Sequence, residues 1–259
     1  MKDSLSYPLS DRKKLLMLGI LCLSSILYNI FYLFGDMRNL PALAALWIMG
    51  FVVLLLVNGY GFRIIKSSLN GLNELPNFNQ WLEMLKNGAK ILIVGIVYLI
   101  PIMIFTLIFY EYFFIYTVSG ILGGTPLSIL AYILEAILTT ILHGTLFHVL
   151  AVKGFPLLVV LIYYVVIIPI YYVAIANLAN NGGKLRTAFN LGEILEKTIK
   201  IGFKKISIFY LLIILIIYWC ELTNIVYLIL ATLIVVPYLK IFISRFVGLI
   251  YIDTIQKEI

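Results

Sequence analysis

The most concentrated chemistry in the sequence is a polar stripe in the apolar run 127–150. Glu135, Thr139 and His143 recur at every fourth residue, which places all three on nearly one face of a helix. A carboxylate, a hydroxyl and an imidazole arranged in this way could line a water-filled path through a membrane. The same stripe could instead lie at the membrane surface and serve only to make that face polar.

The other residues with chemical potential do not form a known catalytic or metal-binding pattern. His148 stands five residues after His143, so the two imidazoles occupy different faces of a helix and could meet only through tertiary contacts. Cys22 and Cys220 both lie in apolar runs and form no C-x-x-C pair. The Gly-Gly-Lys sequence at 182–184 lacks the earlier glycine and the hydroxyl of a phosphate-binding loop. We therefore expect no catalytic residues, no metal and no cofactor. Enzymatic activity stays open, but no recognisable catalytic pattern supports it.

The composition explains why such residues are rare. Hydrophobic residues make up 63% of the 259 residues and charged residues 12%, with a mean hydropathy of +1.09. Soluble domains are about 45–50% apolar and about 25% charged. An excess of this size requires lipid as the solvent. We expect an all-α fold, a polytopic transmembrane bundle that forms a single integral membrane domain over residues 1–259.

Seven apolar runs are candidates for membrane spans, because a spanning helix needs about 20 mostly apolar residues. The runs are 15–34, 40–57, 91–109, 127–150, 155–178, 206–220 and 225–239. Arg12, Lys13 and Lys14 precede the first run, which is too long for a signal peptide, so we interpret it as a retained span.

The distribution of basic residues predicts the orientation of these spans. Lysines and arginines cluster before residue 15, in 58–90 and in 180–205, and such clusters favour the cytoplasmic side. All three clusters are cytoplasmic only if the run 127–150, with its polar stripe, does not span. We therefore expect six spans in the cell membrane with both termini cytoplasmic. The alternative is seven spans with one exception to the charge rule.

The net charge of +7 also bears on the partners of the chain. The basic residues sit at the ends of apolar runs, where they match the anionic headgroups of the cytoplasmic leaflet. A nucleic-acid partner is not expected, since no basic cluster is interleaved with a polar surface. Other proteins, or further copies of the chain, remain open as partners.

The two internal basic segments resemble one another. Each carries a Phe-Asn pair, at 78–79 and at 189–190, and each is followed by a short amphipathic stretch and an apolar run. We expect an interfacial amphipathic helix in each segment. This arrangement suggests an internal duplication of about residues 40–110 and 155–222, although any loop between membrane helices could become amphipathic.

The first segment carries a more specific pattern. It consists of Gly59, Tyr60, Arg63, Leu75, Pro76, Phe78, Trp81, Gly88 and Lys90. This pattern resembles the signature of a domain-of-unknown-function family of archaeal and bacterial multi-pass membrane proteins. The family commonly has Asp before the tryptophan and Gly after it, where this chain has Gln80 and Leu82. The resemblance implies a membrane topology and no particular activity, and we expect the motif to be structural.

Two functions fit these features. A permease-like or channel-like solute transporter would explain the duplication, the prolines inside spans and the stripe Glu135, Thr139 and His143. A membrane-organising or partner-binding subunit without catalysis would explain the two amphipathic helices and the lack of a chemical site. Transport is our preferred hypothesis at this point.

Overall fold

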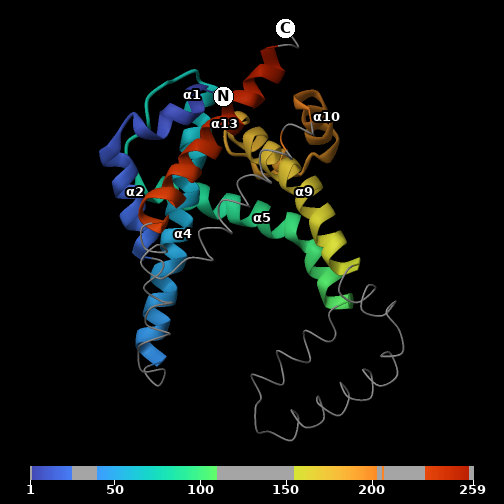
Figure 1. Cartoon of the computed structure of the whole chain (residues 1–259), viewed down its shortest axis with the longest axis horizontal. Helices are drawn as coiled ribbons and strands as arrows, with labels where there is room; N and C mark the ends of the chain where they lie inside the picture. The colour runs from blue at the N-terminus through green and yellow to red at the C-terminus, as the bar shows by residue number, and fades with distance from the viewer. Residues whose placement is uncertain (1, 25–39, 110–154, 203–205, 207–230, 257–259) are drawn as a thin grey trace, which may run out of the picture. The chain divides into compact units, whose positions relative to one another are not determined.

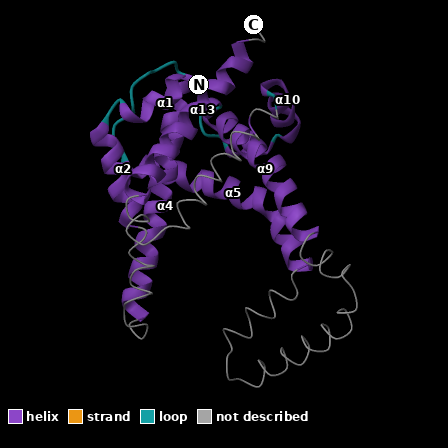
Figure 2. Ribbon diagram, in the orientation of Figure 1, coloured by secondary structure: helices purple, strands orange, loops and turns teal. Residues whose placement is uncertain are grey.

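The computed structural model describes residues 2–24, 40–109, 155–202, 206 and 231–256, and every regular element in these ranges is helical (Figure 1, Figure 2). The all-α expectation is therefore confirmed for this part of the chain. The elements are α1 Lys2–Ser6, η1 Tyr7–Leu9, α2 Arg12–Ser24, α4 Leu40–Leu69, α5 Trp81–Phe109, α9 Phe155–Asn180, η3 Leu185–Phe189, α10 Leu191–Ile201, η4 Ala231–Val235 and α13 Val236–Gln256.

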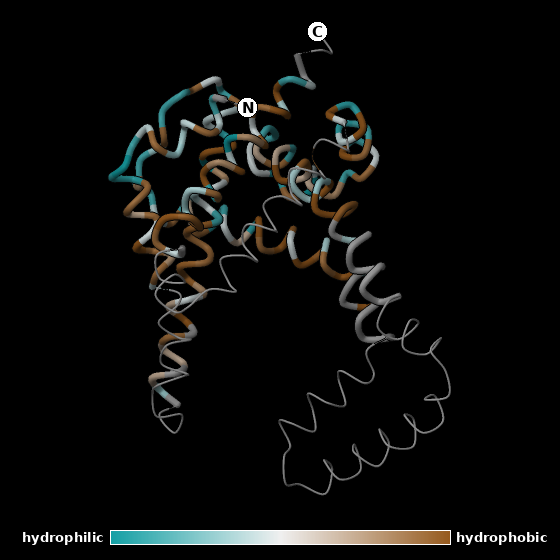
Figure 3. The backbone as a smooth tube through the Cα atoms, viewed as in Figure 1, coloured by the Kyte–Doolittle hydropathy of each residue, from teal (hydrophilic) through white to brown (hydrophobic). Residues whose placement is uncertain are grey.

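Three helical stretches are long and apolar enough to cross a membrane. They are Ala44–Leu69, Trp81–Pro101 and Thr232–Thr254. A shorter apolar helix covers Val165–Asn180, and the apolar character of these stretches is visible in Figure 3. The described residues thus contain three candidate spans rather than six or seven. The run 127–150, and the run 206–220 apart from Ile206, lie outside the described residues.

The first two candidate spans extend further into the basic segment than the sequence suggested. The helix expected to end at residue 57 continues to Leu69. The short helix expected before a separate span at 91–109 is instead the first part of one helix, Trp81–Phe109. The expectation of a separate interfacial helix here is wrong, because nothing between Trp81 and Lys90 stops the helix.

The third candidate span corrects the expected run 225–239. Residues 231–235 form a π-helical turn, and α13 then continues to Gln256. Lys240 and Arg245 follow the expected run 225–239 in sequence, but both lie inside α13. They are tolerated there because polar groups of other elements accept their hydrogen bonds.

The described chain divides into two compact units, Met1–Gly95 with Ile168–Ile259, and Ile96–Ile167. In the second unit, the Tyr163 hydroxyl donates a hydrogen bond to the carbonyl of Tyr98 and so ties α9 to α5. The first unit contains the features discussed below.

The core of the first unit is formed by α2, α4 and α13, which lie side by side (Figure 1). Leu18, Tyr60, Ile64 and Ile241 are fully buried between them. The helices approach closely through small residues, since a methyl group placed on Gly19 of α2 would lie 2.1 Å from the Leu233 carbonyl oxygen in η4. This bundle positions the loop between α4 and α5.

Candidate functional site: a clamped loop and a polar helix seam

The glycines of the motif set the crossing of α4 and α5. A methyl group on Gly59 would lie 1.9 Å from the Met84 carbonyl oxygen, and one on Gly88 would lie 1.9 Å from the Leu55 carbonyl oxygen. Each helix therefore presents a glycine to the backbone of the other. Such a close backbone contact leaves no room for a side chain. This explains why both motif positions are glycine.

Arg63 lies one turn after Gly59 in α4 and holds the end of the loop 70–80 that leads into α5. Its Nη1 donates hydrogen bonds to the carbonyl oxygen of Asn79 at 2.6 Å, the Asn79 side chain at 2.8 Å and the Asn77 carbonyl at 3.2 Å. Its Nη2 donates to Gln80 Oε1 at 2.9 Å and forms an ion pair with Glu83 at 3.4 Å. The planar guanidinium holds several acceptors at once, which an ammonium group could not do in this geometry.

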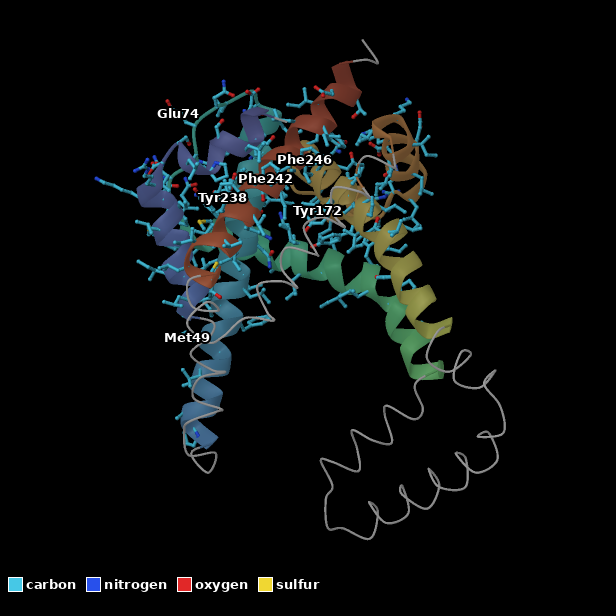
Figure 4. All side chains as sticks on the ribbon, in the orientation of Figure 1. Met49, Glu74, Tyr172, Tyr238, Phe242 and Phe246 are labelled. Carbon is cyan, nitrogen blue, oxygen red and sulfur yellow. The ribbon has the colours of Figure 1, made fainter. Side chains whose placement is uncertain are left out.

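Donors from three other elements take further carbonyls of the same loop. The Tyr7 hydroxyl of η1 donates to Glu74 O at 2.9 Å, and Lys14 Nζ of α2 donates to Leu75 O at 2.7 Å. Arg245 Nη1 of α13 donates to Leu72 O at 2.6 Å. Figure 4 labels Glu74 on this loop, beside α2. A loop without regular structure is thus fixed by cations and hydroxyls rather than by its own backbone.

The aromatic residues of the motif pack under this loop. Tyr60 is fully buried, and its hydroxyl donates to Pro76 O at 3.0 Å while its ring stacks on Phe78 with centroids 4.0 Å apart. Trp81 lies next to Phe78, with centroids 6.2 Å apart. Leu75 is 3% exposed. The Leu-Pro-x-Phe sequence therefore contributes an apolar anchor, a carbonyl acceptor and an aromatic partner.

Gln80 shows what replaces the acidic residue that the resembling family commonly carries. It adopts a left-handed backbone with φ of 52°, and its carbonyl accepts the first helical hydrogen bonds of α5, from Glu83 N and Met84 N. Its side-chain oxygen accepts from Arg63. A neutral amide therefore takes the arginine-facing position in this chain.

Lys90 does not join the other motif residues at the loop. Its Nζ lies beside the turn that follows α9, where a methyl group on Gly183 would come within 3.0 Å of it. A cation beside the last turn of a helix is favoured by the helix dipole. Lys90 thus lies close to the start of the second basic segment.

The loop and α4 border an open polar depression of about 630 Å³. Lys14, Arg63 and Lys66 line it, together with Glu74 and Glu83. Arg63 and Lys14 already donate to loop carbonyls, so their capacity to bind a ligand is largely used. No group of three or more His, Cys, Asp or Glu residues that could hold a metal occurs among the described residues. The arrangement stabilises the loop, since its cations are already bound to loop carbonyls.

Two ionisable groups at the edge of this site are shifted by their surroundings. Burial raises the pKa of the Tyr7 phenol, and the nearby Arg245 guanidinium, which lies 4.6 Å from the ring centroid, acts in the opposite direction. The hydrogen bond from the Lys14 backbone amide lowers the pKa of Asp11. Tyr7 therefore stays neutral and Asp11 charged near neutral pH.

A second polar feature runs along the contact between α4 and α13. Lys240 Nζ donates to Asn58 Oδ1 at 2.7 Å, well inside both candidate spans. A methyl group on Gly61 would lie 3.0 Å from Lys240 Cε, and one on Gly248 would lie 2.5 Å from Ser68 Cβ. Small residues therefore let the two helices approach while a part-buried lysine lies against their contact. We call the contact of Asn58, Gly61 and Ser68 with Lys240, Ser244 and Gly248 the α4–α13 seam.

A third polar cluster holds α10 against α9 and α13. Lys197 Nζ donates to Glu193 Oε1 at 2.6 Å, Tyr251 OH at 2.7 Å and Asn177 Oδ1 at 3.1 Å. Asn177 is fully buried and its amide donates to Thr187 O at 3.0 Å. We call Asn177, Glu193, Lys197 and Tyr251 the α10 lock.

Protonation in the α10 lock follows from these contacts. The hydrogen bond from Lys197 lowers the pKa of Glu193, against a smaller opposing effect of burial. Burial alone would lower the pKa of Lys197, but the hydrogen bonds to Glu193 and Tyr251 outweigh it and raise the pKa. The pair is therefore ionised around neutral pH.

The sequence-derived stripe of Glu135, Thr139 and His143 lies outside the described residues. The contact of Lys240 with α4 was not predicted from the sequence. A signal was present, because Lys240, Ser244 and Gly248 recur at every fourth residue and so mark one face of α13. Tyr238, Phe242 and Phe246 form a separate aromatic row on the same helix (Figure 4).

Comparison with known proteins gives a family and no function. No curated protein matches the chain. No solved structure matches it. A model of a family described as a protein of unknown function, DUF4013, matches residues 42–236. The match includes α4, α5, α9 and α10 with the whole motif loop, so the chain belongs to this family of proteins of unknown function.

Proposed function

We propose that this chain is a multi-pass protein of the cell membrane with permease-like or channel-like solute transport as its activity. Three described helices are long and apolar enough to span. The six-span topology with cytoplasmic termini is part of the proposal and is supported by the positions of the basic clusters. The loop 70–80, which joins two helices that carry basic residues, and the basic segment 181–202 would then lie on the cytoplasmic side.

The observation that carries the proposal is the part-buried lysine in the α4–α13 seam, at the level of both candidate spans. Ionisable side chains at membrane depth are costly and mark pathways for solutes or protons. Lys240 is paired with the neutral Asn58, and α13 is irregular just before it, with a π-helical turn at Ala231–Val235 followed by Pro237. Interrupted helices next to a polar group at membrane depth are typical of transporter binding sites.

A similarity between the two basic segments supports the duplication that belongs to this proposal. The same spacing separates Tyr60 from Tyr171, the Asn-Gly pair at 70–71 from that at 181–182, and the Phe-Asn pair at 78–79 from that at 189–190. Gly71 and Gly182 both have positive φ, at 71° and 67°, and both follow the end of a long helix. Parallel repeats of this kind occur in transporters.

The test is flux through the purified protein in vesicles, using a panel of small anions, cations and neutral solutes. Lys240→Met should abolish the movement of any transported solute and leave the protein folded. Lys66→Met is the matched control, because Lys66 lies on α4 but is exposed. Absence of flux across the panel, or equal flux in both variants, would overturn the role of the seam.

The clamped loop favours the second candidate, a membrane-organising or partner-binding subunit. Its rigid backbone and its 630 Å³ depression could receive a protein partner without any catalysis. Cross-linking in native membranes followed by affinity purification should then recover one stable partner. Recovery of the chain alone would count against this function.

A further inference from the structure

The amphipathic helix α10 presents three distinct faces. Ile194 and Thr198 are buried, at 0% and 1% exposed, and face the rest of the unit. Glu196 and Lys200 are exposed and form an ion pair of 2.7 Å on the polar face. A third, apolar face lies between these two. An ordinary surface helix of a soluble protein has only a buried apolar face and an exposed polar face.

That third face consists of Leu191, Leu195 and Ile199. They are 55%, 43% and 73% exposed, and their spacing of four residues places them in one row. Single exposed apolar residues are ordinary on protein surfaces, but a continuous apolar row bordered by charges marks a contact surface. Phe189, at 36% exposed, extends the row beyond the start of α10.

The α10 lock prevents the helix from turning this row inward. Lys197 contacts α9 through Asn177 and α13 through Tyr251. Rotation of α10 that buried Leu195 would break these bonds and expose Ile194. The apolar row is therefore held outward by a buried polar cluster.

The charges near the row indicate the kind of partner. Lys184 and Arg186 are exposed in the turn that leads into α10, and Lys197 and Lys200 follow in the helix against only Glu193 and Glu196. An exposed apolar row with a basic surplus beside it matches the boundary between acyl chains and anionic headgroups.

We propose that α10 lies in the headgroup plane of an anionic membrane leaflet, with Leu191, Leu195 and Ile199 inserted among the acyl chains and Lys184 and Arg186 on the headgroup phosphates. This inference rests on the proposed membrane location but is independent of transport. The three faces of α10 then have three different neighbours. The face of Ile194 and Thr198 contacts protein, the apolar row contacts lipid, and the face of Glu196 and Lys200 contacts water.

The experiment places nitroxide labels along α10 in vesicles and measures their accessibility to oxygen and to a water-soluble nickel chelate. Labels enter at Leu195→Cys and Ile199→Cys, with Glu196→Cys as the control on the polar face, after Cys22→Ala and Cys220→Ala. If the first of these two replacements unfolds the protein, Cys22 can stay, because it is buried and 6% exposed. Vesicles contain phosphatidylcholine alone or with phosphatidylglycerol.

We expect labels at 195 and 199 to favour oxygen several-fold more than the label at 196, and to move deeper when phosphatidylglycerol is present. Lys184→Gln with Arg186→Gln should remove that dependence on anionic lipid. Chelate-accessible labels at 195 and 199 would overturn the proposal in favour of a water-exposed row. Labels shielded from both reagents would overturn it in favour of a protein partner. Flux is not measured, so failure here leaves the transport proposal standing.

Discussion

The two basic segments start alike and continue differently. After an Asn-Gly turn and a Phe-Asn pair, Trp81–Phe109 runs as one helix into a candidate span, while Leu191–Ile201 stops at Gly202. Gly202 has φ of 94°, and its amide donates to Ile199 O, which ends α10. At the corresponding place α5 has Lys90 and Ile91, which continue the helix. Gly202 therefore explains why α10 is a short separate helix, whereas α5 continues without a break into a candidate span.

The segments are also held by different chemistry. In the first, Arg63 binds backbone carbonyls of the loop and so fixes the chain itself. In the second, Lys197 binds side chains of other helices and so fixes the position of a finished helix. The stability of the first segment should therefore depend on the helix crossing and on the geometry of its hydrogen-bond donors. The stability of the second should depend on the charges of Glu193 and Lys197.

The largest expected effect tests the crossing that supports the first segment. Gly59→Ala places a methyl group 1.9 Å from the Met84 carbonyl oxygen. The two helix backbones must separate, at a cost of about 3 kcal/mol, which corresponds to a fall of roughly 6–12 °C in thermal midpoint. The midpoint can be measured in detergent by the fluorescence of a thiol dye or by light scattering.

The matched control is Gly50→Ala in the same helix, where nothing lies within 4 Å of the added methyl group. Because alanine favours a helix more than glycine does, this variant should be stabilised by about 0.5–1 kcal/mol. Equal midpoints for the two variants would show that α4 and α5 do not cross through Gly59.

The next effect separates charge from geometry at the loop. Arg63→Lys keeps the positive charge but loses the fork that binds Asn77, Asn79 and Gln80, at a cost of about 2 kcal/mol. Hydrogen exchange of residues 70–80 should accelerate. Arg186→Lys in the second segment should change stability by less than about 0.5 kcal/mol, because Arg186 is exposed. A loop that stays protected in Arg63→Lys would contradict the clamp.

A smaller effect is expected when a single hydrogen bond to the same loop, from the Tyr60 hydroxyl to the Pro76 carbonyl, is removed. Tyr60→Phe removes the hydroxyl that donates to Pro76 O and leaves the stacking on Phe78 in place. The loss is about 1 kcal/mol, since one part-buried carbonyl is left without its donor. The thermal midpoint measures it, and Tyr60→Leu provides the comparison because that variant also loses the stacking. Identical midpoints for these two variants would mean that the ring contributes nothing.

Much of this architecture could be anticipated from residue patterns. Apolar length predicts helices in α4, α5 and α9, and the amphipathic spacing of Leu191–Ile201 predicts a helix that lies apart from the spans. These features depend on local sequence, in which hydrophobic periodicity and glycine turns are strong signals.

The features that could not be anticipated depend on tertiary partners. Lys240 and Arg245 look like markers of a span end until Asn58, Ser68 and Leu72 are known to receive their hydrogen bonds. The role of Arg63 depends in the same way on backbone carbonyls of a loop, which no side-chain pattern reveals. Trp81–Lys90 was mistaken for a separate helix because its charged face resembles that of α10, although it lacks a residue such as Gly202 to end it.

The smallest expected effect tests whether charge holds the second segment. The pKa of Glu193 is lowered from its ordinary 4.5, chiefly by the hydrogen bond from Lys197, so its contribution to docking is complete above about pH 4.5 and is lost as the pH falls through the lower folded value. The pKa of Lys197 is raised from its ordinary 10.5, so its contribution is complete below that value and is lost as the pH rises through the higher folded value.

Docking of α10 should therefore be constant between these limits and weaken in acid. Hydrogen exchange of Leu191–Ile201, corrected for its intrinsic pH dependence, should rise in the wild type as the pH falls from neutral into the acid range below the carboxyl's ordinary pKa of 4.5. Residues 81–90 serve as the internal reference because they continue into a span. Glu193→Gln should exchange faster at neutral pH and lose most of the acid response, since its amide cannot titrate. The effect is modest because the carboxylate is partly exposed, at 35% of its side chain, and water screens the pair. An acid response that persists unchanged in Glu193→Gln would assign the titration to another group and leave the α10 lock dependent on Asn177 and Tyr251 alone.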